Sequence, residues 1–278
     1  MNYNPETSRP GLSSYLTRLL AAGRLVFSRD EAQAAIGVGR GAFLDAAEKL
    51  QRRGQLLNAR QGFYIIVPPQ HLNFGSPPPP SFIDDLMRHE KRPYYVGLLK
   101  AAELHGAAHH AVMEFQVVTD KQMQAVQAGR SKIAFYFRKD ITAVASGIED
   151  YKTDTGKMKL SSVELTLLDL LRYPQGSGGL DNVMIIFEDL GPKIGAARIS
   201  ALSSAFERSV IQRAGYLLDH SGFEQPAAEL HAFLEGASHL QWTELDPSLP
   251  SHSDLAPKII ARDKRWHVLV RRLPERDE

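Results

Sequence analysis

Cysteine is absent from this chain of 278 residues. Disulfide bonds, thiolate catalysis and cysteine-based zinc sites are therefore excluded, and a cytoplasmic location fits best. Long apolar runs are absent too, since no segment approaches the roughly 18 consecutive apolar residues of a transmembrane helix. Residues Met1 to Glu6 are polar. We therefore expect neither a membrane span nor a secretory signal.

Positive and negative charges nearly balance over the whole chain, but its first part has an excess of positive charge. The formal net charge is only +1. Residues 1–71 nevertheless contain nine Arg and Lys against five Asp and Glu, a net charge of about +4, so the remainder is about −3. Duplex DNA favours such clustering, because each neutralised phosphate releases counterions. The length of 278 residues is enough for two domains, and a hydrophobic content of 43% supports substantial cores.

The basic segment begins with the pattern of a helix-turn-helix. Ser28 and Glu31 form a capping box that opens a helix ending near Ile36. The glycines of 37–39 then break the chain before a second helix, expected over 40–53. Its apolar residues recur at the spacing of one helix face: Phe43, Ala46, Ala47 and Leu50.

Two short strands follow this second helix. Residues 56–58 and 63–67 have the composition of strands, and 59–62 would form the tip between them. Two helices at a tight turn followed by a hairpin is the order of a DNA-binding winged helix. A winged helix that makes only protein contacts is the alternative. The basic excess favours double-stranded DNA as the partner.

The candidate DNA-binding residues lie on the outward side of the second helix, at the helix starts and at the hairpin tip. They are Arg29, Arg40, Gly41, Asp45, Lys49, Arg52, Arg53, Arg60 and Gln61. We interpret Lys49, Arg52 and Arg53 as phosphate contacts that set position, while Gly41 leaves the helix start bare.

The remaining candidates have two interpretations each. Asp45 and its neighbour Glu48 would either accept a hydrogen bond from a cytosine N4 amine or pair with nearby Arg and Lys, and the second interpretation is favoured. Arg60 and Gln61 would reach phosphates or a minor groove, but a solvated hairpin tip explains them nearly as well.

Proline marks the end of the basic segment. The run from Gly75 to Pro80, with four consecutive prolines, predicts an extended spacer and a domain boundary near residue 75. We therefore divide the chain into a winged helix-turn-helix DNA-binding domain, 1–75, and a C-terminal domain, 76–278.

The C-terminal domain mixes helical and strand patterns. Trp242 and Trp266 are interpreted as core residues. Helices are expected at 84–90 and 94–105, strands at 114–119 and 132–137, a hairpin over 149–160, a helix after the capping box 161–164, helices to about 236, and strands at 240–244 and 266–270. The predicted fold class is α+β: an N-terminal winged helix-turn-helix domain plus a larger mixed α/β domain.

No catalytic pattern is visible in the larger domain. His105, His109 and His110 are the most suggestive cluster, but Gly106 interrupts the helix and no acid completes a zinc motif, so capping and loop hydrogen bonds are favoured. The glycine runs 37–41 and 176–179 lack the context of a dinucleotide loop or a P-loop. We expect no enzymatic activity, no metal and no cofactor.

Several segments resemble the AbiEi family, the antitoxins of AbiE abortive-infection toxin–antitoxin systems. In chain order they are GFYIIVPP at 62–69, YYVGLLKAAELHG at 94–106, EFQVVTD at 114–120, SSVELTLLDLLRY at 161–173, GGLDNV at 178–183, RAGYLL at 213–218 and LDP at 245–247. Together they cover nearly the whole chain in order.

The resemblance implies a type IV antitoxin active in phage defence. Its winged helix would repress its own operon at inverted repeats in the promoter. Its C-terminal domain would counter an AbiEii-like nucleotidyltransferase toxin, either directly or indirectly. The residues alone leave two alternatives: a ligand-responsive winged-helix transcriptional regulator, whose larger domain senses a small molecule, and an enzyme that carries a winged helix.

Overall fold

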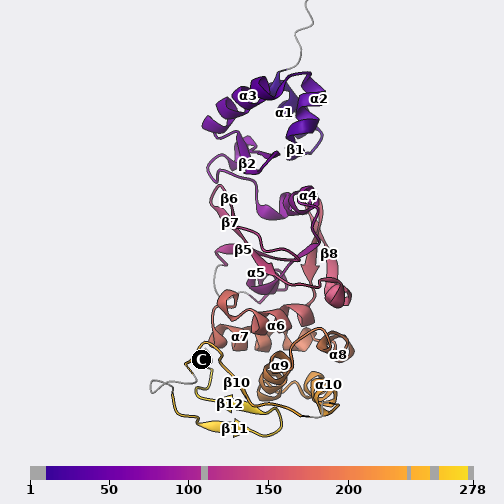
Figure 1. The fold of residues 1–278 in the computed structure, drawn as a ribbon, viewed down its shortest axis with the longest axis vertical. Helices are drawn as coiled ribbons and strands as arrows, with labels where there is room; N and C mark the ends of the chain where they lie inside the picture. Colours follow the sequence, from indigo (N-terminus) through magenta and orange to yellow (C-terminus); the bar gives the residue numbers. More distant parts are fainter. Residues whose placement is uncertain (1–10, 108–111, 237–238, 251–256, 275–278) are drawn as a thin grey trace, which may run out of the picture.

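The computed structural model describes residues 11–107, 112–236, 239–250 and 257–274. The fold is mixed α+β, as predicted. The molecule is elongated (Figure 1): a small helical and strand part stands at one end, a mixed sheet fills the middle, and helices with a second small sheet form the other end. This arrangement places the chain's N-terminal helices far from its C-terminal strands.

The N-terminal end has the element order of a winged helix. Its elements are α1 (Leu12–Ala21), β1 (Val26–Ser28), α2 (Arg29–Ile36), α3 (Arg40–Arg52), β2 (Leu56–Arg60) and β3 (Phe63–Ile66), with the strands in the order β1-β3-β2. The Ser28 hydroxyl accepts the N–H of Glu31 at 3.1 Å, which confirms the predicted cap of α2. Gly37 ends α2 with φ of 67°, a left-handed conformation that favours glycine. Neither α1 nor β1 was expected from the sequence.

A mixed sheet forms the middle of the molecule, in the order β6-β7-β5-β4-β9-β8. Its strands are β4 (Tyr94–Val96), β5 (Glu114–Thr119), β6 (Val126–Ala128), β7 (Ser131–Phe137), β8 (Ile148–Thr153) and β9 (Gly156–Ser161). The pairs β4·β9 and β5·β7 are parallel, and the other neighbours are antiparallel. The short helices around it are η1 (Pro69–His71), η2 (Pro79–Ser81), α4 (Ile83–His89), α5 (Leu98–Leu104) and η3 (Thr142–Gly147).

The helix predicted over 94–105 is wrong in its first part. Tyr95 and Val96 are fully buried in β4, a central strand, and α5 begins only at Leu98. Gly97 separates the two elements, because a Cβ at this position would lie 3.2 Å from both the Tyr95 ring and the Val118 side chain. Residues 94–96 are aromatic and β-branched and favour a strand, but they directly precede a helix-forming run, so the prediction included them in the helix.

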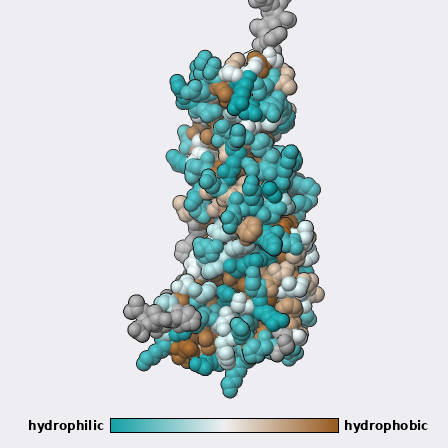
Figure 2. Space-filling model, in the orientation of Figure 1, coloured by the Kyte–Doolittle hydropathy of each residue, from teal (hydrophilic) through white to brown (hydrophobic). Residues whose placement is uncertain are grey.

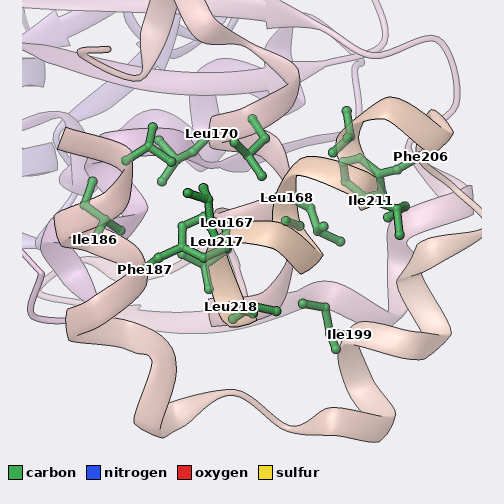
Figure 3. Close-up of a cluster of buried hydrophobic side chains, with 14 of the residues drawn as sticks. Leu167, Leu168, Leu170, Ile186, Phe187, Ile199, Phe206, Ile211, Leu217 and Leu218 are labelled. Atoms are coloured by element: carbon green, nitrogen blue, oxygen red, sulfur yellow. The ribbon is translucent and has the colours of Figure 1, made fainter. Parts of the chain in front are cut away.

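The helical end surrounds one large core, shown in Figure 3. Its elements are α6 (Val163–Arg172), η4 (Pro174–Gly176), α7 (Leu180–Leu190), η5 (Gly191–Lys193), α8 (Ala196–Ser203), α9 (Arg208–His220), α10 (Glu224–Glu235), β10 (Thr243–Glu244), β11 (Ala261–Asp263) and β12 (Val268–Val270). The N-cap of α6 is Ser162 rather than Ser161, since the Ser162 hydroxyl accepts the N–H of Leu165 at 3.3 Å.

The two tryptophans differ in burial. Trp266 is fully buried, as predicted, and packs so closely on α9 that a Cβ at Gly215 would lie 1.9 Å from its ring. Trp242 is 43% exposed and stacks on His267, so its predicted place in the core is wrong. Strand-like context alone did not distinguish a core position from a surface one.

The proline run is not the extended spacer that we predicted. Pro77 and Pro79 are buried, and the run ends in the 3₁₀ helix η2. Side chains from the winged-helix hairpin, among them Phe63 and Ile65, share a hydrophobic cluster with Phe82 of the sheet part. The N-terminal part is therefore packed against the sheet part by apolar contacts that cross residue 75.

One ion pair lies entirely inside the sheet and helix interface. The Arg138 guanidinium and the Asp169 carboxylate are 2% and 0% exposed, and Arg138 Nη1 lies 3.7 Å from Asp169 Oδ1. Tyr95 donates to Asp169 at 2.6 Å, and the Arg138 guanidinium lies 4.4 Å from the centre of the Phe206 ring. Burial raises the pKa of Asp169 to about 6, against a smaller lowering by Arg138.

Candidate nucleic-acid interface

The helix α3 lies at the N-terminal end of the elongated molecule, away from the mixed sheet (Figure 1). Its buried face is formed by Phe43, Ala47 and Leu50, which are at most 5% exposed. Ala46, expected on the same face, is only partly buried. The apolar periodicity therefore predicted which side of α3 faces the core, and the opposite side is free for a partner.

The exposed side of α3 carries positive charges that are available to a partner. Arg40, Lys49 and Arg53 are exposed, and none of them forms an ion pair within the described ranges. Arg52 pairs with Glu48 at 2.6 Å, but both side chains are mostly exposed, so this pair contributes little and exchanges readily with a phosphate. The surface seen at this end in Figure 2 is largely hydrophilic.

The two glycines at the start of α3 leave its backbone accessible. Gly39 is the N-cap and offers no side-chain cap, and a Cβ at Gly39 or Gly41 would meet no atom within 4 Å. The start of the helix is therefore uncrowded on the side of these two glycines. Such a start allows close approach to a nucleic-acid backbone.

The two acidic residues of α3 behave differently. Glu48 pairs with Arg52, in agreement with the favoured interpretation of its role. Asp45 is exposed, and within the part of the chain that the structure describes it has neither an ion-pair nor a hydrogen-bond partner. The sequence does not distinguish the two carboxylates, but the structure does, because within the described residues only Glu48 is paired.

Arg29 lies apart from the α3 cations. It is the first residue of α2, its side chain is 24% exposed, and it contacts the neighbouring Asp30 at 3.2 Å. Its N–H donates to the carbonyl of Gly62 in the hairpin tip. Arg29 therefore joins α2 to the hairpin, on a different element from the free charges of α3.

In the hairpin tip Arg60 packs toward the mixed sheet, whereas the neighbouring Gln61 is exposed. The Arg60 guanidinium lies 5.6 Å from the centre of the Phe135 ring and donates to the carbonyl of Gln124. Its Nε atom is 3.9 Å from Glu90, and both side chains are under a quarter exposed. In this arrangement Arg60 is engaged within the molecule and is not free to reach DNA.

Gln61 is exposed and joins this contact through its backbone alone. Its carbonyl lies 3.2 Å from His89 Nε2, and the His89 ring lies 5.2 Å from that of Phe63. The structure therefore brings Arg40, Gly41, Asp45, Lys49, Arg52 and Arg53 together on one element and places Arg60 and Gln61 elsewhere. No local pattern indicates this docking, because Glu90, Gln124 and Phe135 are distant from Arg60 along the chain.

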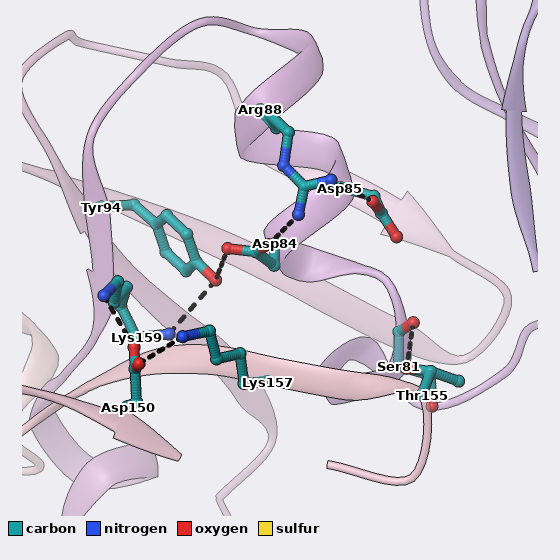
Figure 4. A network of polar contacts seen from close by, with 9 residues as sticks. All are labelled: Ser81, Asp84, Asp85, Arg88, Tyr94, Asp150, Thr155, Lys157 and Lys159. Carbon is teal, nitrogen blue, oxygen red and sulfur yellow. Dashed lines mark hydrogen bonds and ion pairs between the residues drawn. The ribbon is translucent and has the colours of Figure 1, made fainter. Parts of the chain in front are cut away.

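A polar cleft of about 380 Å³ lies where the winged helix meets the sheet. It is lined by the turn after α1 (23–26), by 80–82, 84, 85 and 88 around α4, and by 155–157 between β8 and β9. Figure 4 shows contacts of its charged groups: Arg88 pairs with Asp84 and Asp85 of the lining, and Lys157 pairs with Asp150, which lies outside the lining. Burial raises the pKa of Asp85 above its ordinary value.

The histidine cluster considered for a metal falls mostly outside the described residues, which include neither His109 nor His110. His105, at the C-terminal end of α5, has its Nε2 atom 2.7 Å from the carbonyl of Ser161 at the end of β9. Within the described ranges no group of three or more His, Cys, Asp or Glu side chains is placed to hold a metal ion. In the same ranges no helix is long and apolar enough to cross a membrane.

Comparison with known proteins supports the resemblance seen in the sequence. Residues 95–220, from β4 to the end of α9, match the family described as AbiEi antitoxin C-terminal domain, which confirms that resemblance over this region. The crystal structure of the RV2827C protein from Mycobacterium tuberculosis is similar with a TM-score of 0.66 and 16% identity, covering 93% of this chain and 90% of that one. That likeness shows a shared fold. No curated protein matches the sequence.

Proposed function

We propose that this chain, whose residues 95–220 match an AbiEi antitoxin domain, is the antitoxin of an AbiE-like toxin–antitoxin system. The domain match is the observation that carries the proposal. The toxin would be a nucleotidyltransferase encoded beside it, countered in the cytoplasm either by direct contact or indirectly. The chain itself would act without catalysis.

The second half of the proposal concerns the operon. We infer that α3 binds double-stranded DNA of the chain's own promoter at inverted repeats, and thereby represses transcription. The free cations of α3, its bare glycine start and its distance from the sheet support this role. The boundary between a DNA-binding part and an antitoxin part would lie near residue 75, although the two share apolar contacts.

Growth rescue tests the antitoxin proposal. The adjacent reading frame would be induced in cells that supply either the full-length chain or an empty vector. We expect growth arrest with the empty vector and growth with the full chain. Absence of toxicity, or arrest in both strains, would rule out this antitoxin function.

Salt titrations distinguish the α3 cations from the hairpin arginine. Arg52→Ala and Lys49→Ala should each weaken promoter binding about equally on all sequences and reduce the slope of log affinity against log salt by roughly one. Arg60→Ala should leave the slope unchanged, because Arg60 is engaged with Phe135 and Glu90. It should instead lower the free energy of unfolding by about 1 kcal/mol.

These titrations have a clear contrary result. If the slope falls with Arg60→Ala and stays constant with both α3 variants, the hairpin tip is the phosphate contact and the docking seen here is not the DNA-bound arrangement.

A ligand-responsive transcriptional regulator is the second candidate. The polar cleft between winged helix and sheet favours it, because residues from both parts line the cleft and an occupant would contact both. Promoter affinity measured with and without a metabolite extract tests this candidate. A change in promoter affinity that depends on the extract and is abolished by Arg88→Ala would support a sensor. Identical affinities with and without extract would rule out the sensor, and the antitoxin proposal would remain.

A further inference from the structure

The carboxylate of Asp45 is out of place on a surface that binds phosphates. At 3.6 residues per turn, Gly41, Asp45 and Arg52 lie within roughly 30° of the direction opposite to the buried face of α3. Asp45 therefore stands at the centre of the exposed side, in the first half of the helix. In helix-turn-helix proteins this part of the second helix contacts base edges.

The structure removes the ordinary explanation for such a carboxylate. Acidic residues on a helix surface are commonly paired with a cation three or four residues away. Glu48 follows that rule with Arg52 at 2.6 Å. Asp45 has a cation at the same spacing, Lys49, but no ion pair joins them in the described part of the chain. Its oxygens are available as acceptors.

We propose that Asp45 reads a cytosine in the major groove, by accepting a hydrogen bond from the N4 amine. The proposal rests on the proposed DNA-binding function and specifies which base α3 recognises. In the major groove cytosine presents the N4 amine as its donor, whereas adenine places the N7 acceptor beside its N6 donor, where a carboxylate would be repelled. Guanine and thymine offer that carboxylate acceptors only.

The neighbourhood of Asp45 supports this geometry. Gly41, one turn earlier on the same face, has no side chain, and a Cβ there would meet nothing within 4 Å, so the helix can lie deep enough for a short side chain to reach a base. Arg52, two turns later, is positioned for the phosphate backbone. Along this face Gly41 leaves the backbone uncovered, Asp45 offers a hydrogen-bond acceptor, and Arg52 offers a positive charge.

A comparison of two alanine variants tests the inference. Full-length wild type, Asp45→Ala and Glu48→Ala would be titrated by fluorescence anisotropy with a promoter fragment, with a shuffled fragment of equal length, and with promoter fragments in which each C·G pair is changed to T·A. Both residues are exposed on the same helix face and each variant removes one negative charge, so Glu48→Ala is the matched control.

The two variants should differ in discrimination. For wild type and Glu48→Ala, one C·G to T·A change in each half-site should weaken binding roughly 5- to 150-fold. For Asp45→Ala that change should have no effect, while binding to shuffled DNA becomes tighter because a repulsive charge is gone. Loss of base discrimination together with tighter non-specific binding is a signature that a merely solvated carboxylate would not give.

Two results would overturn the inference, and they are distinguishable from failure of the DNA-binding proposal. If Asp45→Ala binds every fragment more tightly by one factor and keeps all base preferences, Asp45 is only a solvated charge. If wild type binds promoter and shuffled DNA alike, α3 reads no base. Absence of any DNA binding by wild type would remove both proposals together.

Discussion

Neutralising the exposed cations of α3 is expected to abolish promoter binding at physiological salt. The variant replaces Arg40, Lys49, Arg52 and Arg53 by Ala. Each phosphate contact contributes about 5-fold in affinity at 0.15 M salt through counterion release, so four lost contacts reduce affinity on the order of a thousandfold. The slope of log affinity against log salt should fall by about four.

This variant should fold normally, because all four side chains are exposed and alanine favours a helix. A matched control removes four exposed cations elsewhere on the chain: Lys139, Lys152, Arg262 and Lys264. We expect the control to bind the promoter within a few-fold of wild type. Equal losses of promoter affinity in both variants would mean that binding depends on net charge alone and that α3 is not the DNA-binding element.

The largest expected effect on stability comes from the buried pair Asp169–Arg138. Asp169→Ala leaves the Arg138 guanidinium without its counter-ion at 2% exposure, and Tyr95 without its acceptor. Removing one member of a buried pair typically costs about 3–5 kcal/mol. Because desolvation of the Asp169 carboxylate outweighs the attraction of Arg138, we expect a loss at the lower end of this range, as measured by urea unfolding. In a double-mutant cycle of Arg138→Met and Asp169→Leu, the double variant should lose less than the sum of these two single variants. Strict additivity would show that the two charges do not interact.

The same carboxyl gives stability a pH dependence with a defined sign. Burial raises the pKa of Asp169 from its ordinary 3.8 to about 6 in the folded chain. The folded state therefore holds the proton more tightly, so the contribution is fully present below about pH 4 and is lost as the pH rises through 6, by about 3 kcal/mol. Asp169→Asn does not titrate and should lack this fall between pH 4 and 6. An identical pH profile in the variant would assign the fall to another group.

Local patterns predicted the elements on which the site depends. The spacing of Phe43, Ala47 and Leu50 identified α3 and its buried side, and Ser28 identified the start of α2. The hairpin around residue 154 was also predicted, and β8 and β9 confirm it. In each case the signal lies within one turn or one hairpin, where residues that are close in sequence determine the structure.

Contacts between distant segments were not predictable in this way. Nothing near Arg60 indicates that its partners are Phe135 and Glu90, so the hairpin tip looked free. The proline run looked like a spacer because composition does not show that Pro77 and Pro79 are covered. Asp45 and Glu48 looked alike, and only the observed pairing with Arg52 separates them.

Repression by α3 and antitoxicity of the C-terminal part can be separated by measuring repression and growth rescue in the same cells. Cells would carry a promoter reporter and the inducible adjacent reading frame, together with either wild type or the variant in which Arg40, Lys49, Arg52 and Arg53 are alanine. We expect wild type to repress the reporter and rescue growth, and the variant to rescue growth without repression. Loss of rescue along with repression in a folded variant would contradict this expectation, because α3 would then be needed for antitoxicity as well.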